Sequence, residues 1–262
     1  MIAQGYFMKK SASLKKVVSF IRDYCDIDSF SDYPPAHNGL QFENSGSVTK
    51  IAAAVNAGLA EIQNAAHMGA DLLLVHHGLF WSPIEPVVEY NYEKFKTLID
   101  SDMAVCAVHL PLDAHPEIGN NVLIAKALNL KVSGRCFEHE GQNIGVIANA
   151  PRGGTPELCK LLRSLFGETY KEILFGSSAP KKVAICSGSC GDVLPIMRDY
   201  GIDTLICGEL KLRHFTMAQE MKLNLYPCGH YATERLGIAA LGGLVAKKFG
   251  LQSCFVEMRN PL

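Results

Sequence analysis

Residues 69–78 read Gly-Ala-Asp-Leu-Leu-Leu-Val-His-His-Gly, an aliphatic run that ends in two neighbouring histidines. A short apolar run bounded by polar residues is typical of a strand buried on both faces, as in a parallel sheet. Residues 201–209 read Gly-Ile-Asp-Thr-Leu-Ile-Cys-Gly-Glu and align with this run without a gap, as residues 182–187 do with residues 50–55. The sequence therefore predicts an internal repeat of strand–helix–strand units.

Each half of the repeat also carries a histidine four residues before an acid, directly after an apolar segment. The first half has His109-Leu-Pro-Leu-Asp113, and the second half has His230-Tyr-Ala-Thr-Glu234. These motifs are offset differently from the upstream strands, which predicts a short insertion in the first half, within residues 82–93.

Strand-like and helix-like segments alternate along the rest of the chain, which favours an α/β fold. We expect two related α/β lobes around a pseudo-two-fold axis, each a mixed sheet flanked by helices. The polar residues 134–142 mark the expected boundary. The lobes would then comprise residues 1–133 and 134–262, with a site between them. Residues 193–200 are among the segments expected to form α-helices.

The composition excludes several classes of protein. The 262 residues carry 25 basic and 26 acidic side chains, so no basic excess is available to bind a nucleic-acid backbone non-specifically. No apolar stretch reaches the roughly 18 residues that a membrane span requires, and residues 1–16 lack the apolar core of a signal peptide. The nine cysteines are odd in number and scattered, which predicts reduced thiols in a cytoplasmic protein.

Histidines and acids follow the ends of three apolar strands, where ligands bind in open α/β sheets. His76 and His77 are neighbours whose side chains diverge, so they can reach two metal ions a few ångströms apart. Each His-x-x-x-acid motif places both members on one face if it begins a helical turn. Imidazole and carboxylate together suit Zn, Fe, Mn or Ni better than Ca or Mg. The pattern predicts a site for two divalent ions, which Glu234 can bridge.

Several stretches resemble the Nif-three-like family, whose members are also named GTP cyclohydrolase 1 type 2 homologues. The similar segments lie within roughly residues 14–259 and are Asn38–Glu43, Asp71–Trp81, Ala107–Asp113, Val183–Gly191, Gly208–Glu209 and Gly229–Gly237. The resemblance implies two similar α/β lobes, a ring-like homohexamer and a dinuclear metal site. The metal ligands that it implies are His76, His77, Asp113, His230 and Glu234. His109 corresponds to a histidine beside or on the metals, and Glu209 to an acid that faces the same cavity.

The leading hypothesis is a metal-dependent hydrolase of a small nucleotide-like or phosphoester substrate, in which water is the nucleophile. The ligands divide into two sets that share Glu234: His76 and Asp113 for one ion, His77 and His230 for the other. His109 or Glu209 would move the proton of the attacking water.

Two other functions use the same residues or their neighbours. A metal chaperone or carrier, or a non-catalytic scaffold, would bind metal with the same ligands and without turnover. Association with nucleic acid would need Lys211, Arg213 and Arg235 to lie on one face, and the charge balance disfavours this function.

Overall fold

The computed structural model describes residues 10–81 and 85–261, and their contacts divide the chain into two compact units. Unit 1 comprises the described residues up to Ser29, Tyr33–Val108 and Ala239–Met258. Unit 2 comprises Phe30–Asp32, His109–Ile238 and the described residues from Arg259 onward. These bounds differ from the lobes expected at 1–133 and 134–262. The reason is that the helices after Val108 pack on the second sheet, while the last strand of the chain joins the first sheet.

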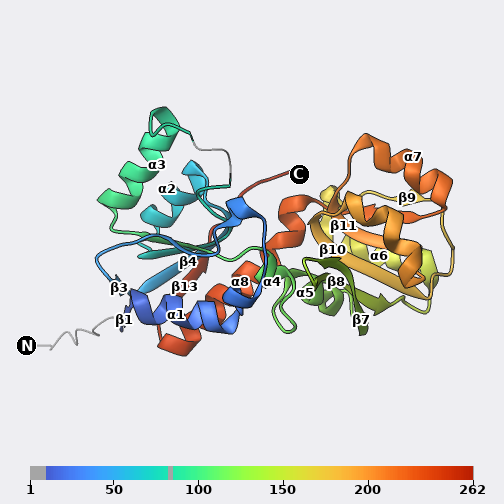
Figure 1. Ribbon diagram of the computed structural model, residues 1–262, viewed down its shortest axis with the longest axis horizontal. Coiled ribbons are helices and arrows are strands. Elements are labelled where there is room, and N and C mark those ends of the chain that lie inside the picture. The colour runs from blue at the N-terminus through green and yellow to red at the C-terminus, as the bar shows by residue number, and fades with distance from the viewer. Residues whose placement is uncertain (1–9, 82–84, 262) are drawn as a thin grey trace, which may run out of the picture. The chain divides into compact units, whose positions relative to one another are not determined.

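Unit 1 is built on a five-stranded mixed sheet in the order β13-β4-β5-β6-β2. Its parallel strands are β4 (Lys50–Asn56), β5 (Leu72–His77), β6 (Ala104–Ala107) and β13 (Gln252–Phe255), and its antiparallel edge strand is β2 (Gly39–Phe42). One face is covered by α2 (Leu59–His67) and α3 (Glu89–Asp100), and the other by α1 (Leu14–Tyr24) and the later turns of α8 (His230–Phe249) (Figure 1). Smaller elements are the ribbon of β1 (Ala12–Ser13) and β3 (Ser47–Val48) and the 3₁₀ helices η1 (Ile27–Ser29) and η2 (Pro34–Ala36).

The acid of the repeated Gly-x-Asp motif fixes the start of this sheet. Asp71 Oδ2 accepts hydrogen bonds from the backbone N–H and the hydroxyl of Thr49, both at 2.6 Å, and from the N–H of Lys50 at 2.9 Å. These bonds hold the start of β4 against the start of β5. The four aliphatic residues that follow, Leu72–Val75, are completely buried between the two helical layers, as the unbroken apolar run predicts.

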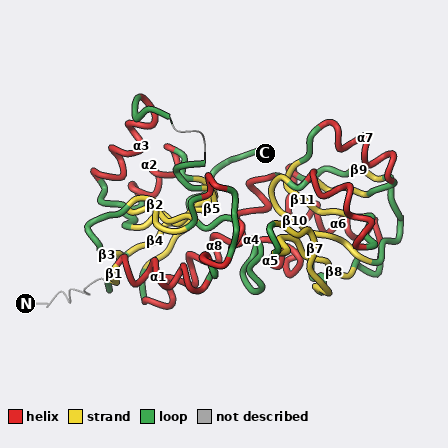
Figure 2. Tube along the Cα trace, in the orientation of Figure 1, coloured by secondary structure: helices red, strands yellow, loops and turns green. Residues whose placement is uncertain are grey.

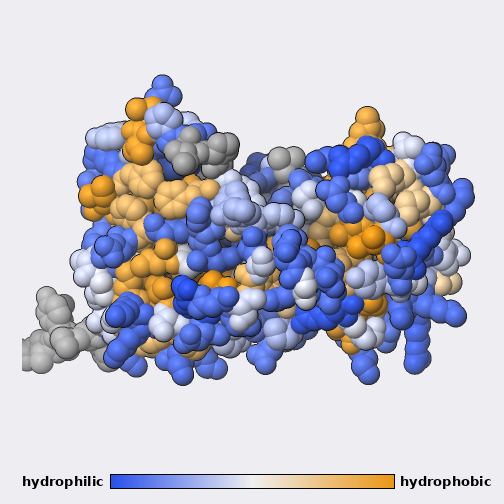
Figure 3. Space-filling view, in the orientation of Figure 1, coloured by the Kyte–Doolittle hydropathy of each residue, from blue (hydrophilic) through white to orange (hydrophobic). Residues whose placement is uncertain are grey.

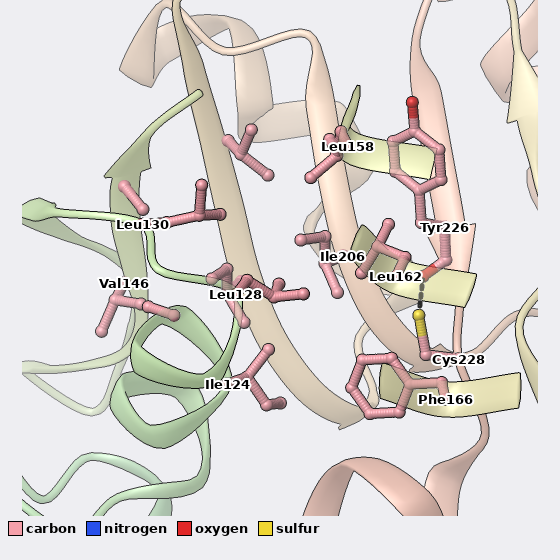
Figure 4. Packing of buried hydrophobic residues seen from close by; sticks show 14 of the residues in the cluster. Ile124, Leu128, Leu130, Val146, Leu158, Leu162, Phe166, Ile206, Tyr226 and Cys228 are labelled. Carbon is pink, nitrogen blue, oxygen red and sulfur yellow. Dashed lines mark hydrogen bonds between the residues drawn. The ribbon is translucent and has the colours of Figure 1, made fainter. Parts of the chain in front are cut away.

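Unit 2 is built on a six-stranded mixed sheet in the order β7-β8-β10-β11-β12-β9. The strands are β7 (Val132–His139), β8 (Gln142–Asn149), β9 (Ile173–Leu174), β10 (Lys182–Ser189), β11 (Thr204–Glu209) and β12 (Asn224–Pro227). On one face α5 (Asn120–Ala127) and α6 (Gly154–Phe166) form the apolar core drawn in Figure 4. The opposite face is covered by the 3₁₀ helix η4 (Gly191–Tyr200) and by α7 (Leu212–Met221). Two short helices, α4 (Leu110–Asp113) and η3 (Gly167–Thr169), complete the unit.

The predicted repeat is visible in the topology of the two sheets. Each contains three parallel strands in chain order, β4-β5-β6 and β10-β11-β12, with an antiparallel strand beyond the third. This confirms the predicted α/β fold of two mixed sheets flanked by helices (Figure 2). The β5–β6 connection (78–103) is longer than the β11–β12 connection (210–223), as the expected insertion requires, although residues 82–84 lie outside the described residues. The two-fold relation between the lobes stays a prediction.

Residues 134–142 were expected to be a boundary between lobes, and this prediction is wrong. They form most of β7 and its turn into β8, and the two strands pair antiparallel along their lengths. Glu140 and Gly141 both have positive φ, 48° and 84°, as a two-residue turn of a twisted hairpin requires. The segment is polar because β7 is an edge strand with one exposed side, not because it is a linker.

The segment expected as an α-helix at 193–200 is instead η4, a 3₁₀ helix. Pro195 lies inside it and has no N–H to donate, so a regular α-helical ladder cannot form there. The expectation that all nine cysteines are reduced is also wrong, because Cys186 and Cys190 form a disulfide. No helix in the described part of the chain is both long enough and apolar enough to cross a membrane.

The packing of α8 on β4 yields a matched pair of substitutions. A Cβ atom added at Gly242 would lie 2.9 Å from Cβ of Ala53, whereas one added at Gly243 meets nothing within 4 Å. Alanine is about 1 kcal/mol better than glycine inside a helix. We therefore expect Gly243→Ala to raise the free energy of unfolding by up to about 1 kcal/mol, and Gly242→Ala to lower it by about 1–3 kcal/mol through overpacking. Urea denaturation of both variants checks this, and equal effects of the two substitutions would contradict it.

Candidate metal-binding residues

The histidine pair of unit 1 lies at the end of β5. His76 is completely buried, and its Nδ1 lies 3.0 Å from the carbonyl oxygen of Val108. His77 pairs across the sheet with Asn56, whose Oδ1 lies 2.8 Å from His77 Nδ1. Because the two side chains leave the strand in different directions, their rings are tilted by 50° with centroids 4.8 Å apart. Unit 1 thus presents two imidazoles from neighbouring positions, each held by an oxygen atom.

In unit 2, His109 and Asp113 flank the short helix α4. The carboxylate of Asp32 accepts hydrogen bonds from His109 Nδ1 and from the N–H of Leu110, both at 2.9 Å. Asp113 is only 6% exposed, and its Oδ1 accepts from Asn120 Nδ2 at 2.8 Å and from the Ser187 hydroxyl at 2.9 Å. The residues around α4 therefore fix both polar groups of the first His-x-x-x-acid motif.

The second motif forms the first turn of α8, immediately after β12. His230 Nε2 lies 3.1 Å from Oε2 of Glu234, one helical turn on, and His230 Nδ1 lies 3.3 Å from Oε1 of Glu209 at the end of β11. Glu234 is only 3% exposed, and one of its carboxylate oxygens lies within 4.8 Å of one from Asp113. Unit 2 by itself thus gathers an imidazole and two buried carboxylates that could serve as metal ligands.

The hydrogen bonds of His76, His77 and His109 determine which ring nitrogen carries a lone pair. A carbonyl, amide or carboxylate oxygen at Nδ1 can only accept a hydrogen bond from it, so Nδ1 carries the proton and Nε2 of the neutral ring carries the lone pair. This holds for His76, His77 and His109. Metal-ligating histidines are commonly oriented in this way by an oxygen at the other nitrogen.

His230 lies between two carboxylates. Burial lowers the pKa of His230, but the hydrogen bonds and negative charges of Glu234 and Glu209 raise it by more, to about 9. A neutral imidazole has one N–H and can donate to only one of the two acids, whereas the protonated ring donates to both. The two carboxylates therefore stabilise a positive charge at His230, which either a second proton on the ring or a bound metal ion supplies.

The sequence identified these donors but not the residues that orient them. Asn56, Asn120, Ser187 and the Val108 carbonyl were not singled out, and Asp32 lies far from His109 in the chain. Asn56 could have been found from the sequence, because it ends β4 in the register position opposite His77. Asp32 lies in a loop without periodic structure, so no pattern connects it with His109.

Trp81 borders the histidine pair of unit 1. Its ring centroid lies 5.1 Å from that of His77 with the planes tilted by 48°, and the residue is 38% exposed. Phe80, the preceding residue, is also exposed and contacts His37 edge-on. Unit 1 therefore presents partly exposed aromatic surface directly beside a candidate metal ligand.

The pKa of His230 gives a pH-dependent prediction for the metal-free protein. Because the folded-state pKa is raised, the stabilisation is fully present below about pH 6.5 and is lost as the pH rises through about 9. We expect Glu234→Gln to lower the pKa of His230 in an NMR titration. We also expect the variant to lose up to about 3 kcal/mol of unfolding free energy at pH 6 and much less at pH 10. Glu220→Gln, at an exposed glutamate of α7, is the control. A pH-independent loss in Glu234→Gln would contradict the prediction.

Comparison with known proteins places these residues in a family. A family model described as Duf34/NIF3 (NGG1p interacting factor 3) matches residues 12–261. The chain is 36% identical over 250 residues to a protein of Deinococcus radiodurans named GTP cyclohydrolase 1 type 2 homolog, with 94% of each chain covered. It is 35% identical over 244 residues to a protein of Escherichia coli of the same name, with 89% of this chain and 93% of that protein covered.

Solved structures agree with this assignment. A protein named ybgI, described as of unknown function, superposes with a TM-score of 0.88 at 31% identity, covering 96% of this chain and 100% of that chain. A protein of Thermus thermophilus superposes with a TM-score of 0.85 at 31% identity and the same coverage. The chain belongs to the Duf34/NIF3 family.

Proposed function

We propose that this protein binds two divalent metal ions and is a metal-dependent hydrolase of a small nucleotide-like or phosphoester substrate. The observation that carries the proposal is the state of the histidines. His76 and His77 each direct Nδ1 to an oxygen atom, which leaves the lone pair on Nε2, and His230 lies beside carboxylates that favour a positive charge. Imidazole nitrogens combined with carboxylates fit Zn, Fe, Mn or Ni.

The proposed ligand sets are those that the sequence motifs predict. His76 with Asp113 would hold one ion and His77 with His230 the other, with Glu234 shared between them. Val108, whose carbonyl oxygen accepts the hydrogen bond of His76, is followed directly in the sequence by His109 and the first His-x-x-x-acid motif. Such a pair of ions would lower the pKa of a water molecule and polarise a substrate oxygen.

The protein's own groups would move the proton. Of the two candidates, His109 is better suited, because Asp32 holds its Nδ1 and leaves the Nε2 lone pair to accept a proton and the resulting charge to be balanced. Glu209 is close to His230 Nδ1, so we assign it the role of orienting that ligand. Asp32 and Glu209 are thus positioning residues in this proposal.

The aromatic residues beside His77 favour a substrate with a planar ring. Stacking on a partly exposed Trp81 suits a heteroaromatic base, and the relatives are named as homologues of an enzyme that acts on a purine nucleotide. The alternative of a metal carrier or scaffold uses the same ligands, and it predicts metal binding without turnover.

Metal content is the first prediction to test. We expect elemental analysis to find about two first-row metal ions per chain, and Glu234→Ala to lose one or both while remaining folded. Asn56→Ala removes the oxygen that holds His77, and we expect it to weaken metal binding by about 10–100-fold. Asn64→Ala, at an exposed position of α2, should bind as the parent does. Absence of metal even after incubation with Zn²⁺, Mn²⁺ or Fe²⁺ would overturn the proposed function. Tight metal binding without hydrolysis of any nucleotide or phosphoester would favour the carrier.

Trp81 is the single tryptophan of the chain, so its fluorescence reports on the surface beside His77. We expect GTP to quench this fluorescence and inorganic triphosphate, which has no ring, to leave it nearly unchanged. Stacking on an aromatic ring contributes about 1–3 kcal/mol, so Trp81→Leu should weaken GTP binding in calorimetry by about 5–150-fold. Trp81→Phe should retain most of the affinity. Equal quenching by both compounds, or unchanged affinity of Trp81→Leu, would rule out the stacking role.

The ring-like homohexamer that the family resemblance implies also remains a proposal. It is supported by exposed apolar side chains on both units, among them Ile99 of α3, which is 66% exposed, and Leu212 of α7, which is 91% exposed. Figure 3 shows such apolar areas within a mainly hydrophilic surface. Contact between subunits would remove this surface from water. Light scattering after size-exclusion chromatography measures the number of subunits directly.

A further inference from the structure

The Cys186–Cys190 disulfide lies where β10 ends. Its two cysteines are four residues apart and almost buried, with exposures of 2% and 7%. The other seven cysteines are free thiols. Nothing in the proposed function uses this bond.

The residues enclosed by the disulfide contact both buried acids of the candidate metal centre. The Ser187 hydroxyl donates a hydrogen bond to Asp113 Oδ1 at 2.9 Å, and the Ser187 N–H donates to Asn121 Oδ1 at 2.7 Å. The N–H of Gly188 donates to Thr233 Oγ1 at 3.2 Å, which places the end of β10 against the first turn of α8. A side chain at Gly188 would overlap the carboxylate of Glu234. The conformation of residues 186–190, at the irregular end of β10, therefore sets the surroundings of Asp113 and Glu234.

We propose that Cys186 and Cys190 form a reversible redox site that controls metal affinity. The inference rests on the proposed metal-binding function and adds its regulation. With the disulfide closed, the end of β10 is constrained and Ser187 holds the Asp113 carboxylate in place. When the disulfide opens, the covalent constraint on Ser187 and Gly188 is lost, so Asp113 and Glu234 are less well oriented. The oxidised protein binds metal more tightly than the reduced protein.

Opening and closing the disulfide need only a dithiol as reductant and a hydroperoxide as oxidant. In reduction, a thiolate of a dithiol attacks the sulfur of Cys190, the more exposed of the two residues, and Cys186 leaves as a thiolate that takes up a proton. The second thiol of the dithiol then displaces Cys190, which gives two protein thiols and one oxidised dithiol. In oxidation, a hydroperoxide removes two electrons from the two thiols. With hydrogen peroxide, a Cys thiolate forms a sulfenic acid and the first oxygen leaves as water, and the second thiol then displaces the other oxygen as water.

The coupling must act in both directions, because metal binding and disulfide formation are linked equilibria. If closing the disulfide raises the affinity for metal by a certain factor, bound metal raises the equilibrium constant for disulfide formation by the same factor. This reciprocity separates a coupled redox site from a disulfide that merely lies near the metal ligands.

The test measures Zn²⁺ affinity of the metal-free protein in both redox states. One sample is oxidised with hydrogen peroxide, the other is reduced with a phosphine that is then removed, and each is titrated against a chromophoric chelator. We expect the reduced protein to bind at least one Zn²⁺ about 10-fold or more weakly, in the range typical for disturbing the partners of metal ligands. The double variant Cys186→Ser/Cys190→Ser should show the weaker affinity under both conditions. Cys159→Ser, at a partly exposed free thiol of α6, should keep the difference.

The reciprocal measurement places the protein in glutathione buffers with and without Zn²⁺ and quantifies the Cys186–Cys190 peptide by mass spectrometry. We expect Zn²⁺ to shift the midpoint toward the disulfide by the factor found in the titrations. Equal affinities in the two states, tighter binding by the reduced protein, or no linked peptide after oxidation would overturn the inference and leave the metal site intact. Failure of both forms to bind Zn²⁺, Mn²⁺ or Fe²⁺ would instead overturn the proposed function, and the inference with it.

Discussion

The peptide unit of Val108 is held from two directions, and the candidate site depends on it. Its N–H donates to the carbonyl oxygen of Val75 at 2.9 Å, which continues the pairing of β5 and β6 beyond the last strand residue. Its carbonyl accepts from the ring of His76 at 3.0 Å. Together these bonds fix a buried imidazole and the point at which the chain leaves the sheet toward His109. A buried imidazole without such a partner would cost several kcal/mol in lost hydration.

The same arrangement recurs in unit 2. Beyond β12 the N–H groups of Cys228 and Gly229 donate to the carbonyls of Cys207 and Gly208, both at 2.9 Å, and these bonds set where α8 begins. His230 and Glu234 then follow from helical spacing alone. In both units, strand pairing determines the exit of the chain, and the exit determines the position of the donor groups. Few additional contacts are therefore needed to orient the polar side chains at the ends of these strands.

Much of this arrangement could be predicted from the sequence because strong local signals carry it. The Leu72–Val75 run, the repeated Gly-x-Asp and the two His-x-x-x-acid motifs indicate both sheets and every donor discussed above. Features decided by contacts distant in sequence or by one residue could not be predicted. The β7–β8 hairpin depends on a positive φ at Glu140, and glutamate is rare in turn positions with positive φ. The disulfide depends on the backbone conformation at the end of β10. The number and spacing of the cysteines favoured reduced thiols, and they gave no indication that Cys186 and Cys190 lie close enough to bond.

The order of the strands in unit 1 has a consequence for how the protein is made. β13 is the last strand of the chain, yet it pairs with β4 near the beginning, and the later turns of α8 also belong to unit 1. During synthesis the ribosome therefore releases nearly all of unit 2 before it supplies the residues that complete unit 1. N-terminal domains usually fold first during synthesis, but unit 1 cannot be completed before unit 2 has been synthesised. One edge of β4 therefore stays unpaired until residues 252–255 have been synthesised, and an unpaired strand edge can pair with another chain.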